Sequence, residues 1–275
     1  MTASVPTPVP VSTAAPVSTA ASMPAPVPNP QPLTTSRGRV GSRYYAMTPD
    51  TMVENSLPML PPSSVVVLAA PQGTPARFGQ YLVTLAAGVG TTGEIGVGYE
   101  NFLFVRSGSL RVGSDGDTWM LGADSYLFLP SGRAFEMHAN AATTLIWVKK
   151  PYSPAVGIAP PEVVHGQLVD VEETADDWID GTYGQLLPDD ARYDMAMNIM
   201  RFEPGARFRM IEIHHQEHGL YMLDGGGVYH LDGEHVEVRA DDFVYMAPYC
   251  TQAFTVAGAG PTAYLLYKDV NRDGF

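Results

Sequence analysis

The sequence contains a single cysteine, Cys250, among its 275 residues. One cysteine excludes an intramolecular disulfide and a zinc site built from several cysteines. Such a chain suits a reducing compartment, and we expect a cytoplasmic protein.

Basic residues are also scarce, since 16 Lys and Arg stand against 29 Asp and Glu and give a formal net charge of −13. A chain this acidic does not suit nucleic acid or an anionic membrane surface, so neither is expected as a partner. Long apolar runs are missing too, and "SSVVVLAA" at residues 63–70 is among the longest. A transmembrane helix needs roughly 20 apolar residues, so none is predicted.

Residues 1–36 lack charged side chains altogether, and nine of the first 32 residues are proline. This stretch has neither the basic segment nor the continuous apolar segment of a secretory signal, so no such signal is expected. Its composition predicts a disordered Pro/Ala-rich tail with polyproline II character.

From about residue 80 the chain consists of short segments rich in β-branched and aromatic residues, separated by Gly, Asp and Pro. Examples are "ENFLFVRSG", "SYLFLP" and "TTLIWVKK", and the pattern returns as "HGLYMLDG", "DFVYMAP" and "AYLLYKD". Segments of this length and composition are typical of strands, so the fold class is predicted to be all-β.

The second half repeats the first. Laying Glu100 on Glu217 without gaps gives seven identities in 25 positions, most of them at turns. The other matches are Leu103 with Leu220, Gly108 with Gly225, Asp115-Gly116 with Asp232-Gly233, and Ala123-Asp124 with Ala240-Asp241. We interpret this register as an internal duplication that builds two jelly-roll barrels.

Four segments follow from this interpretation. The tail of residues 1–36 is followed by a first barrel at 37–155, whose early strands are expected to pack on that barrel. An acidic linker with a strand or two of its own is expected at 156–190. The second barrel is expected at 191–275.

The segment "MIEIHHQEHG", residues 210–219, holds three of the seven histidines and two glutamates. It has no helical periodicity, and on a strand alternate residues share a face. Glu212 and His214 then point one way, while Ile211, Ile213 and His215 point the other. His218 follows as the chain turns into the next strand. We predict a metal site here, the alternative being a polar strand surface.

The spacing resembles the cupin motif, with Glu212 in place of its first histidine and His218 in place of its glutamate. The resemblance makes Gln252, in "APYCTQ", the fourth ligand. One carboxylate, two imidazoles and an amide oxygen favour Mn²⁺ or Fe²⁺ over structural zinc, while Zn²⁺, Ni²⁺ and Co²⁺ remain open. The first half lacks all four ligands, having in their places Ile95, Val97, Asn101 and Phe135. Only the second barrel is therefore predicted to bind metal.

The chain further resembles the (S)-ureidoglycine aminohydrolase family of bicupins over about residues 38–273. The most specific segments are "EIHHQEHGLYML", "GVYHLDGEHVEV", "MAPYCTQAF" and "YLLYKDVNRD". The resemblance implies two double-stranded β-helix barrels and a Mn²⁺-dependent hydrolase of allantoin and purine catabolism. The expected reaction releases ammonia from (S)-ureidoglycine and gives (S)-ureidoglycolate. A homo-oligomer, hexamer or octamer, is also implied.

The resemblance also assigns roles to single residues. The metal ligands would be Glu212, His214, His218 and Gln252, and the substrate contacts would be Glu212, Gln252, Tyr229, Tyr264 and Lys268. The catalytic residues would be Glu212, as a proton carrier, and Lys268, as a cation for the substrate carboxylate.

Simpler interpretations stay open for three of these residues. Lys268 could pair with Asp269, and Tyr229 and Tyr264 could be core tyrosines. Cys250, next to the predicted site, is interpreted as a small buried residue because no base is placed beside it. Two other functions also remain, an Fe²⁺-dependent cupin dioxygenase and a non-enzymatic ligand-binding bicupin.

Overall fold

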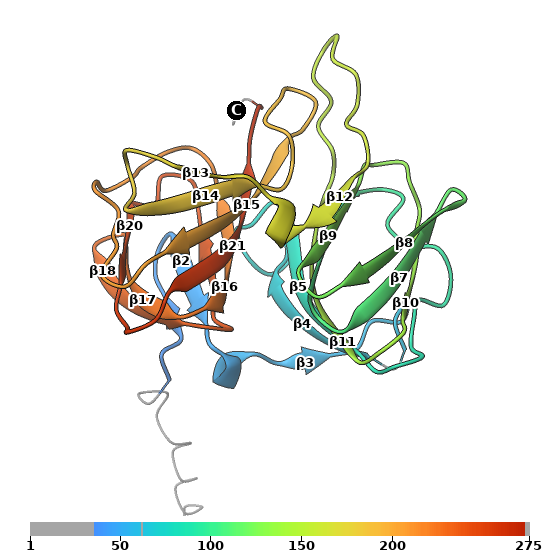
Figure 1. The fold of residues 1–275 in the computed structure, drawn as a ribbon, viewed down its shortest axis with the longest axis horizontal. Coiled ribbons are helices and arrows are strands. Elements are labelled where there is room, and N and C mark those ends of the chain that lie inside the picture. The colour runs from blue at the N-terminus through green and yellow to red at the C-terminus, as the bar shows by residue number, and fades with distance from the viewer. Residues whose placement is uncertain (1–35, 62, 273–275) are drawn as a thin grey trace, which may run out of the picture. The chain divides into compact units, whose positions relative to one another are not determined.

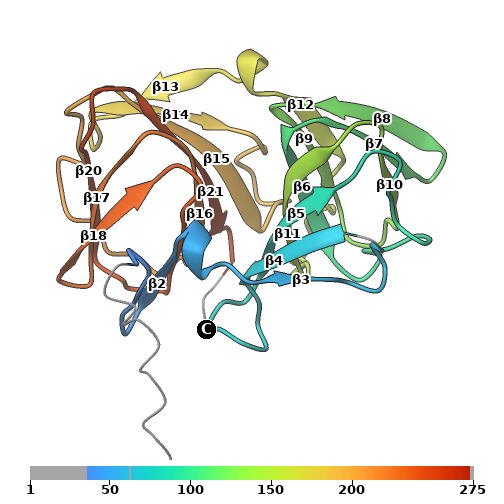
Figure 2. The same ribbon diagram turned by 90° about the horizontal axis from the view of Figure 1, so that it is seen from below.

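The computed structural model describes residues 36–61 and 63–272. Within them, strands are joined by loops and by two short 3-10 turns, η2 (Pro49–Thr51) and η3 (Leu168–Asp170) (Figures 1 and 2). None of the described segments forms a helix of the length and hydrophobicity that would cross a bilayer. The tail expected over residues 1–36 lies outside the described residues except for Ser36, so its disorder stays a prediction.

The first barrel consists of a seven-stranded and a three-stranded antiparallel sheet. The large sheet has the order β12 (Val164–Gln167), β9 (Ser125–Leu129), β6 (Glu100–Ser107), β11 (Thr143–Lys150), β5 (Gly79–Leu85), β4 (Ser63–Ala69), β3 (Glu54–Asn55). The small sheet has the order β10 (Glu136–Ala139), β7 (Ser109–Ser114), β8 (Asp117–Gly122). Strands β6, β9 and β11 coincide with the predicted segments "ENFLFVRSG", "SYLFLP" and "TTLIWVKK", whereas β3 and β12 were not among the predicted segments.

The second barrel repeats this arrangement. Its large sheet has the order β1 (Arg39–Val40), β2 (Tyr44–Met47), β19 (Phe243–Met246), β16 (His218–Asp224), β21 (Thr262–Asp269), β15 (Met195–Phe202), β14 (Gly181–Gln185), β13 (Glu173–Ala175). Its small sheet has the order β18 (Glu234–Arg239), β17 (Gly226–Leu231), β20 (Gln252–Val256). The prediction of an all-β chain with two jelly-roll barrels is confirmed.

The duplicated register is visible in the backbone, because the matched turn residues adopt matched left-handed conformations. The pairs and their φ angles are Gly108 (95°) and Gly225 (70°), Asp115 (50°) and Asp232 (49°), Gly116 (87°) and Gly233 (89°), and Asp124 (62°) and Asp241 (68°). Left-handed φ values favour Gly and Asp over other residues. The turn residues that carried the alignment are thus the ones the fold requires.

Three buried clusters organise the core. One lies inside the first barrel and includes Leu103, Phe135 and Trp147. A second lies inside the second barrel, between its large and small sheets. The third joins the two large sheets and takes alternate residues from each, such as Phe102 of β6 and Tyr267 of β21. Since side chains alternate along a strand, each large sheet has one face toward its own barrel and one toward the other barrel.

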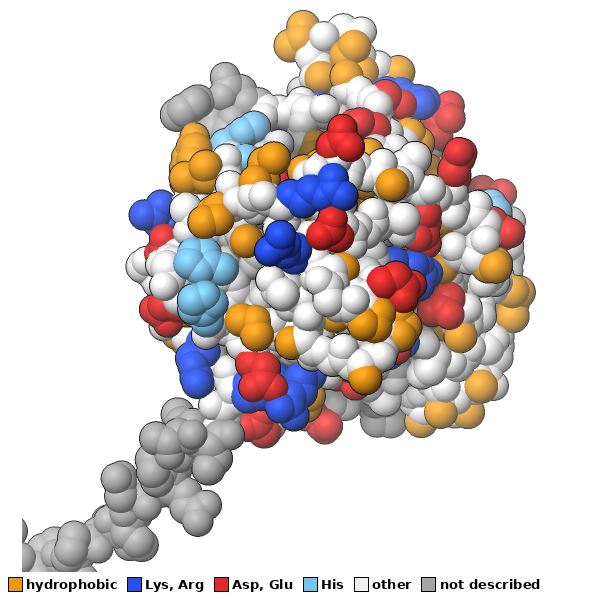
Figure 3. All heavy atoms as spheres, turned by 60° about the vertical axis from the view of Figure 1, so that its left-hand side comes forward, with side chains coloured by type: hydrophobic (Ala, Val, Ile, Leu, Met, Phe, Trp, Pro, Cys, Tyr) orange, Lys and Arg blue, Asp and Glu red, His pale blue; other side chains and the backbone are white. Residues whose placement is uncertain are grey.

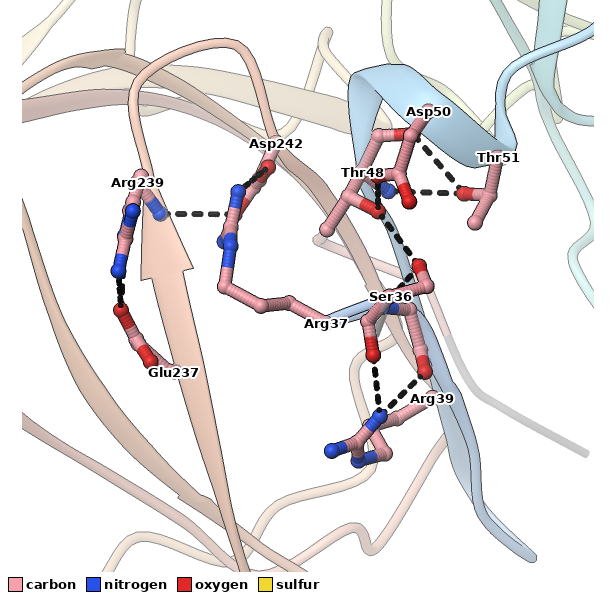
Figure 4. A network of polar contacts seen from close by, with 10 residues as sticks. Ser36, Arg37, Arg39, Thr48, Asp50, Thr51, Glu237, Arg239 and Asp242 are labelled. Carbon is pink, nitrogen blue, oxygen red and sulfur yellow. Dashed lines mark hydrogen bonds and ion pairs between the residues drawn. The ribbon is translucent and has the colours of Figure 1, made fainter. Parts of the chain in front are cut away.

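The expectation that residues 37–80 pack on the first barrel holds for β3 and β4 but not for β1 and β2. Strand β2 pairs with β19 of the second barrel, and its Tyr44 and Ala46 enter that barrel's core. Figure 4 shows the same attachment upstream, where Arg37 pairs with the buried carboxylate of Asp242. The reason is geometric: β19 has a free edge that only a strand from elsewhere in the chain can cover.

The segment expected as a linker, residues 156–190, contributes to both large sheets. Strand β12 pairs with β9 of the first barrel, whereas β13 and β14 extend the large sheet of the second. Strand β12 therefore holds in the first barrel the place that β2 holds in the second.

Candidate active site

The stretch before β16 was expected to form a strand up to His215. It forms no ladder in the described structure and pairs through isolated bridges, Arg207 with Thr255, Phe208 with Ile179 and Glu212 with Gln252. Alternation is nevertheless kept, since Glu212 and His214 are half-buried while Ile211 and Ile213 are each 59% exposed. Glu212 and His214 thus point away from solvent, as the sequence predicts for this face.

Two imidazoles and one amide meet at the end of this segment. The Nε2 atoms of His214 and His218 lie 3.2 Å apart, and the Gln252 side-chain nitrogen lies 2.9 Å from His214 Nε2. Because amide nitrogen and oxygen are assigned from the surrounding contacts, a half-turn of Gln252 presents its oxygen instead. His218 begins β16 and Gln252 begins β20, so the two sheets of the barrel each supply a ligand candidate.

Glu212 adjoins this group through its backbone. Its N–H donates to the Gln252 carbonyl at 2.8 Å and its carbonyl accepts from the Gln252 N–H at 2.9 Å. Over residues 36–61 and 63–272, no three His, Cys, Asp or Glu side chains converge closely enough to hold a metal ion. The converging donors are therefore two imidazoles and one amide, and the Glu212 carboxylate stays a predicted fourth ligand.

These donors suit a divalent cation. Burial lowers the pKa of His214 and lowers that of fully buried His218 much further, and the nearby Lys268 ammonium adds to both shifts. Both rings are thus neutral at pH 7 and offer lone pairs. Burial raises the pKa of the Glu212 carboxyl, and Lys268 opposes that rise. The Nδ1 atoms of both histidines are buried without a hydrogen-bond partner.

Lys268 lies beside the histidines, because β21 pairs with β16 and sets Lys268 directly opposite His218. The alternative ion pair with Asp269 does not form, since Asp269 binds Arg77 at 2.6 Å on the other face of the strand. Tyr229 and Tyr264 are both buried to 1% exposure among aromatic rings of the barrel interior. Burial raises the pKa of Tyr264, and the Glu212 carboxylate adds to the rise. The two tyrosines are therefore core residues that also border Glu212.

The first barrel shows the same bridge without the ligands. Ile95 pairs with Phe135 where the second barrel pairs Glu212 with Gln252. Asn101, in the place of His218, accepts a hydrogen bond from Trp147 Nε1 at 3.1 Å. Phe135 packs edge-on against that same indole at 6.1 Å. Aromatic side chains thus fill the space that polar atoms occupy in the second barrel.

One polar residue near the site was not singled out from the sequence. Asn198 of β15 is 7% exposed and lines a cavity of about 220 Å³ that Lys268 also lines. The four predicted ligands do not line this cavity. Lys268 both lines the cavity and lies beside the predicted ligand His218. The sequence feature that could have identified Asn198 is its position as a lone amide within the apolar run "MAMNIMRF".

The predicted thiol and surface features can also be placed. Cys250 is 2% exposed, and burial raises its pKa to about 11, which suits an inert buried residue. On the face drawn in Figure 3, which brings the second barrel forward, Lys and Arg side chains are interspersed with acidic ones.

Residues 198–267 match the family described as the cupin domain. The (S)-ureidoglycine aminohydrolase of Escherichia coli (strain K12) is 36% identical over 232 residues, which cover 82% of this chain and 88% of that protein. The crystal structure of protein Ylba from E. coli has a TM-score of 0.77 at 33% identity, covering 88% and 97% of the two chains. A putative glyoxylate induced protein from Pseudomonas aeruginosa has a TM-score of 0.79 at 32% identity, covering 87% and 93%.

Proposed function

The chain belongs to the (S)-ureidoglycine aminohydrolase family, and from this premise we propose that it releases ammonia from (S)-ureidoglycine and yields (S)-ureidoglycolate in purine catabolism. The observation that supports this most is the meeting of His214, His218 and Gln252 at the end of the second barrel. The proposed cofactor is Mn²⁺, held by these three residues and Glu212. Two neutral imidazoles with an amide oxygen and a carboxylate are a hard-to-borderline ligand set that suits this ion.

The residues of the chain divide the work. A bound Mn²⁺ supplies Lewis acidity and orients the substrate oxygens. Lys268 carries the positive charge that pairs with the substrate carboxylate, since it forms no ion pair with a carboxylate of the described residues 36–61 and 63–272. Glu212, next to Lys268, transfers the proton that the departing amine requires. The buried Tyr264 hydroxyl stays protonated and donates a hydrogen bond rather than acting as a base.

The stereochemistry follows from the position of the site. In this proposal the metal ligands and Lys268 hold one face of the reacting carbon against the protein, so that water adds from the other face. Loss of the amine leaves a planar, imine-like carbon, and addition from one side gives one enantiomer. A single enantiomer in the product is therefore an expected result.

The test uses the full-length protein, stripped of metal with a chelator and reloaded with Mn²⁺, Fe²⁺ or Zn²⁺. Ureidoglycine is generated in situ from allantoate, and ammonia, product chirality and oxygen uptake are followed together. We expect Mn²⁺-dependent ammonia release, (S)-ureidoglycolate and no oxygen uptake. Oxygen uptake with Fe²⁺ and no ammonia above the spontaneous rate would contradict the proposal and favour a dioxygenase.

Two further parts of the proposal concern the protein in the cell. We propose a homo-oligomer, a hexamer or octamer, and light scattering of the purified protein measures its mass. We also propose a cytoplasmic location, which the single buried thiol of Cys250 supports. Microscopy of a tagged protein checks it.

A further inference from the structure

The cavity of about 220 Å³ beside Lys268 opens at one end of the second barrel. Its walls come from β14, β15 and β21 and include Tyr183, Gln185, Ala196, Asn198, Leu266 and Lys268. The even-numbered residues of β15 and β21 face the barrel interior, as Met200 and Tyr264 do in its core. The cavity is thus a side chamber of the same interior that holds the histidines.

Asn198 places an amide in this chamber. Its side chain is 7% exposed, and it has no side-chain hydrogen bond to any residue of the described ranges 36–61 and 63–272. A primary amide carries two donor hydrogens and one acceptor oxygen. The polar atoms of Asn198 are not among the fully buried atoms that lack a partner, so they reach the accessible space of the chamber. A molecule that enters the chamber can therefore pair with this amide.

The strand register sets Asn198 close to Lys268. Ala196 lies directly opposite Lys268 across β15 and β21, and Asn198 is two residues further on the same face. Diagonal neighbours of this kind are about 7–8 Å apart, within reach of a long side chain. Ala196 is small, so it leaves space between the ammonium and the amide. One small molecule can therefore contact both.

The first barrel has a different residue at this position. Lys149 lies opposite Gly79, as Lys268 lies opposite Ala196, so Tyr81 takes the place of Asn198. The Lys149 ammonium lies 5.1 Å from the Tyr81 ring centre and 4.8 Å from that of Trp147. An aromatic ring thus covers the lysine in the barrel without ligands, whereas an amide stands open in the barrel that has them.

We propose that Asn198 determines substrate specificity by recognising the ureido group, while Lys268 binds the carboxylate. A ureido group offers N–H donors beside a carbonyl acceptor, which is the complement of a primary amide. Together, Asn198 and Lys268 would then bind the two ends of a ureido acid that lies across the chamber. This inference rests on the proposed function, because it names which part of that substrate the site selects.

The test measures binding rather than turnover, by calorimetry on the Mn²⁺-loaded full-length protein. Two stable probes are compared: N-carbamoylglycine, which has the ureido group, and N-acetylglycine, which has a methyl group in place of its terminal amine. We expect the wild type to prefer N-carbamoylglycine by about tenfold, the equivalent of one good hydrogen-bonded pair. The variants Asn198→Ala and Asn198→Leu should lose this preference while still binding N-acetylglycine.

The melting temperature of the variants distinguishes a role of Asn198 in recognition from a role in the fold. Asn198→Leu removes an unpaired amide at nearly constant volume, so its melting temperature should equal or exceed that of the wild type. In turnover, KM for ureidoglycine should rise about tenfold with kcat within a few-fold. Asn140→Ala, at an exposed amide of the first barrel, is the matched control and should change nothing.

The outcomes distinguish this inference from the proposed function. An unchanged probe preference in both variants, or no preference in the wild type, overturns the role of Asn198 even if the protein is an active aminohydrolase. Absence of ammonia release by the wild type overturns the proposed function, while the probe preference still decides whether Asn198 reads a ureido group.

Discussion

The Ile95–Phe135 bridge of the first barrel and the Glu212–Gln252 bridge of the second occupy the same place in the duplicated unit. Around the first, Trp147 and Phe135 fill the interior, and the Asn101 amide accepts from the indole N–H and donates to two backbone carbonyls. Around the second, two imidazoles and an amide point at one another. The strand order and turns are common to both, so they specify the barrel. The interior side chains at the bridge specify whether it can bind a cation.

The largest expected difference is in catalysis. His218→Ala should reduce ammonia release to the spontaneous rate, since loss of a residue that only supports a ligand already costs about 10–100-fold. Asn101→Ala, at the twin position, should leave turnover per folded molecule unchanged. Metal analysis and initial rates on both variants check this. Equal losses in the two variants would mean that the barrels share the chemistry.

The second largest effect concerns stability, and here the larger loss is expected in the first barrel rather than in the second. Phe135→Ala should destabilise the fold by about 3–5 kcal/mol, because it removes a fully buried ring packed on Trp147. Gln252→Ala should cost much less stability but should abolish turnover. Urea unfolding of both variants measures the difference. A Phe135→Ala protein as stable as the wild type would show that the first interior is not close-packed.

A smaller effect is expected between the barrels, where Glu100 and Glu217 are twins. Among residues 36–61 and 63–272, neither oxygen of Glu100 has a hydrogen-bond partner, although the Lys150 ammonium lies 3.7 Å from Oε1. Burial with the nearby Asp194 carboxylate raises the Glu100 pKa to about 9. Burial also raises the pKa of Glu217, but Glu217 accepts from the Arg77 N–H at 3.1 Å and from the Tyr245 hydroxyl at 3.2 Å, and both contacts oppose the rise.

The pKa of Glu100 predicts a pH dependence. The folded protein binds this proton more tightly than the unfolded chain, whose reference pKa is 4.5. The stability it contributes is complete below about pH 4.5 and is lost as the pH rises toward 9. Glu100→Gln should therefore be more stable than the wild type at pH 8 by about 1–3 kcal/mol, and Glu217→Gln less stable. Unfolding curves at pH 5 and pH 8 test this, and a gain for Glu100→Gln that does not grow with pH would refute it.

The smallest effect is expected at the twin lysines. Lys149 is enclosed by the rings of Tyr81, Tyr99 and Trp147, and burial lowers its pKa. Lys149→Met removes the cation–π contacts, which lowers the stability, and also removes a desolvated ammonium, which raises it. The free energy of unfolding should therefore change by less than about 1 kcal/mol. Activity should be unaffected, whereas Lys268→Met should raise KM strongly. Thermal melts and kinetics on the pair decide it, and an activity loss in Lys149→Met would contradict the comparison.

Sequence alone was sufficient for the duplication, because Gly108, Asp115 and Asp124 must adopt left-handed conformations and so recur in both halves. It was also sufficient for the face shared by Glu212 and His214, since alternation survives even where the ladder does not. The metal, the four-ligand set and the catalytic roles stay predictions.

What could not be read from the sequence depends on contacts between distant segments. Nothing in "YYAM" tells which sheet edge β2 will cover, because both large sheets have a free edge of similar composition. The ion pair of Lys150 could not be predicted either. Its ammonium binds Asp194 at 2.7 Å between the two barrels, and no sequence motif links the two residues. The environment of Asn198 is likewise invisible until β14 and β21 are placed on either side of it.

Strand β2 joins the large sheet of the second barrel, and strand β12 joins that of the first. This has a consequence for how the protein can be divided. The strand that precedes the first repeat completes the second barrel, and the strand that precedes the second repeat completes the first. A fragment cut at the repeat boundary would carry one strand with no sheet to join and one sheet with an uncovered edge, which invites aggregation. Interlocked in this way, the halves should fold only together, and co-expressed fragments should regain activity that neither has alone.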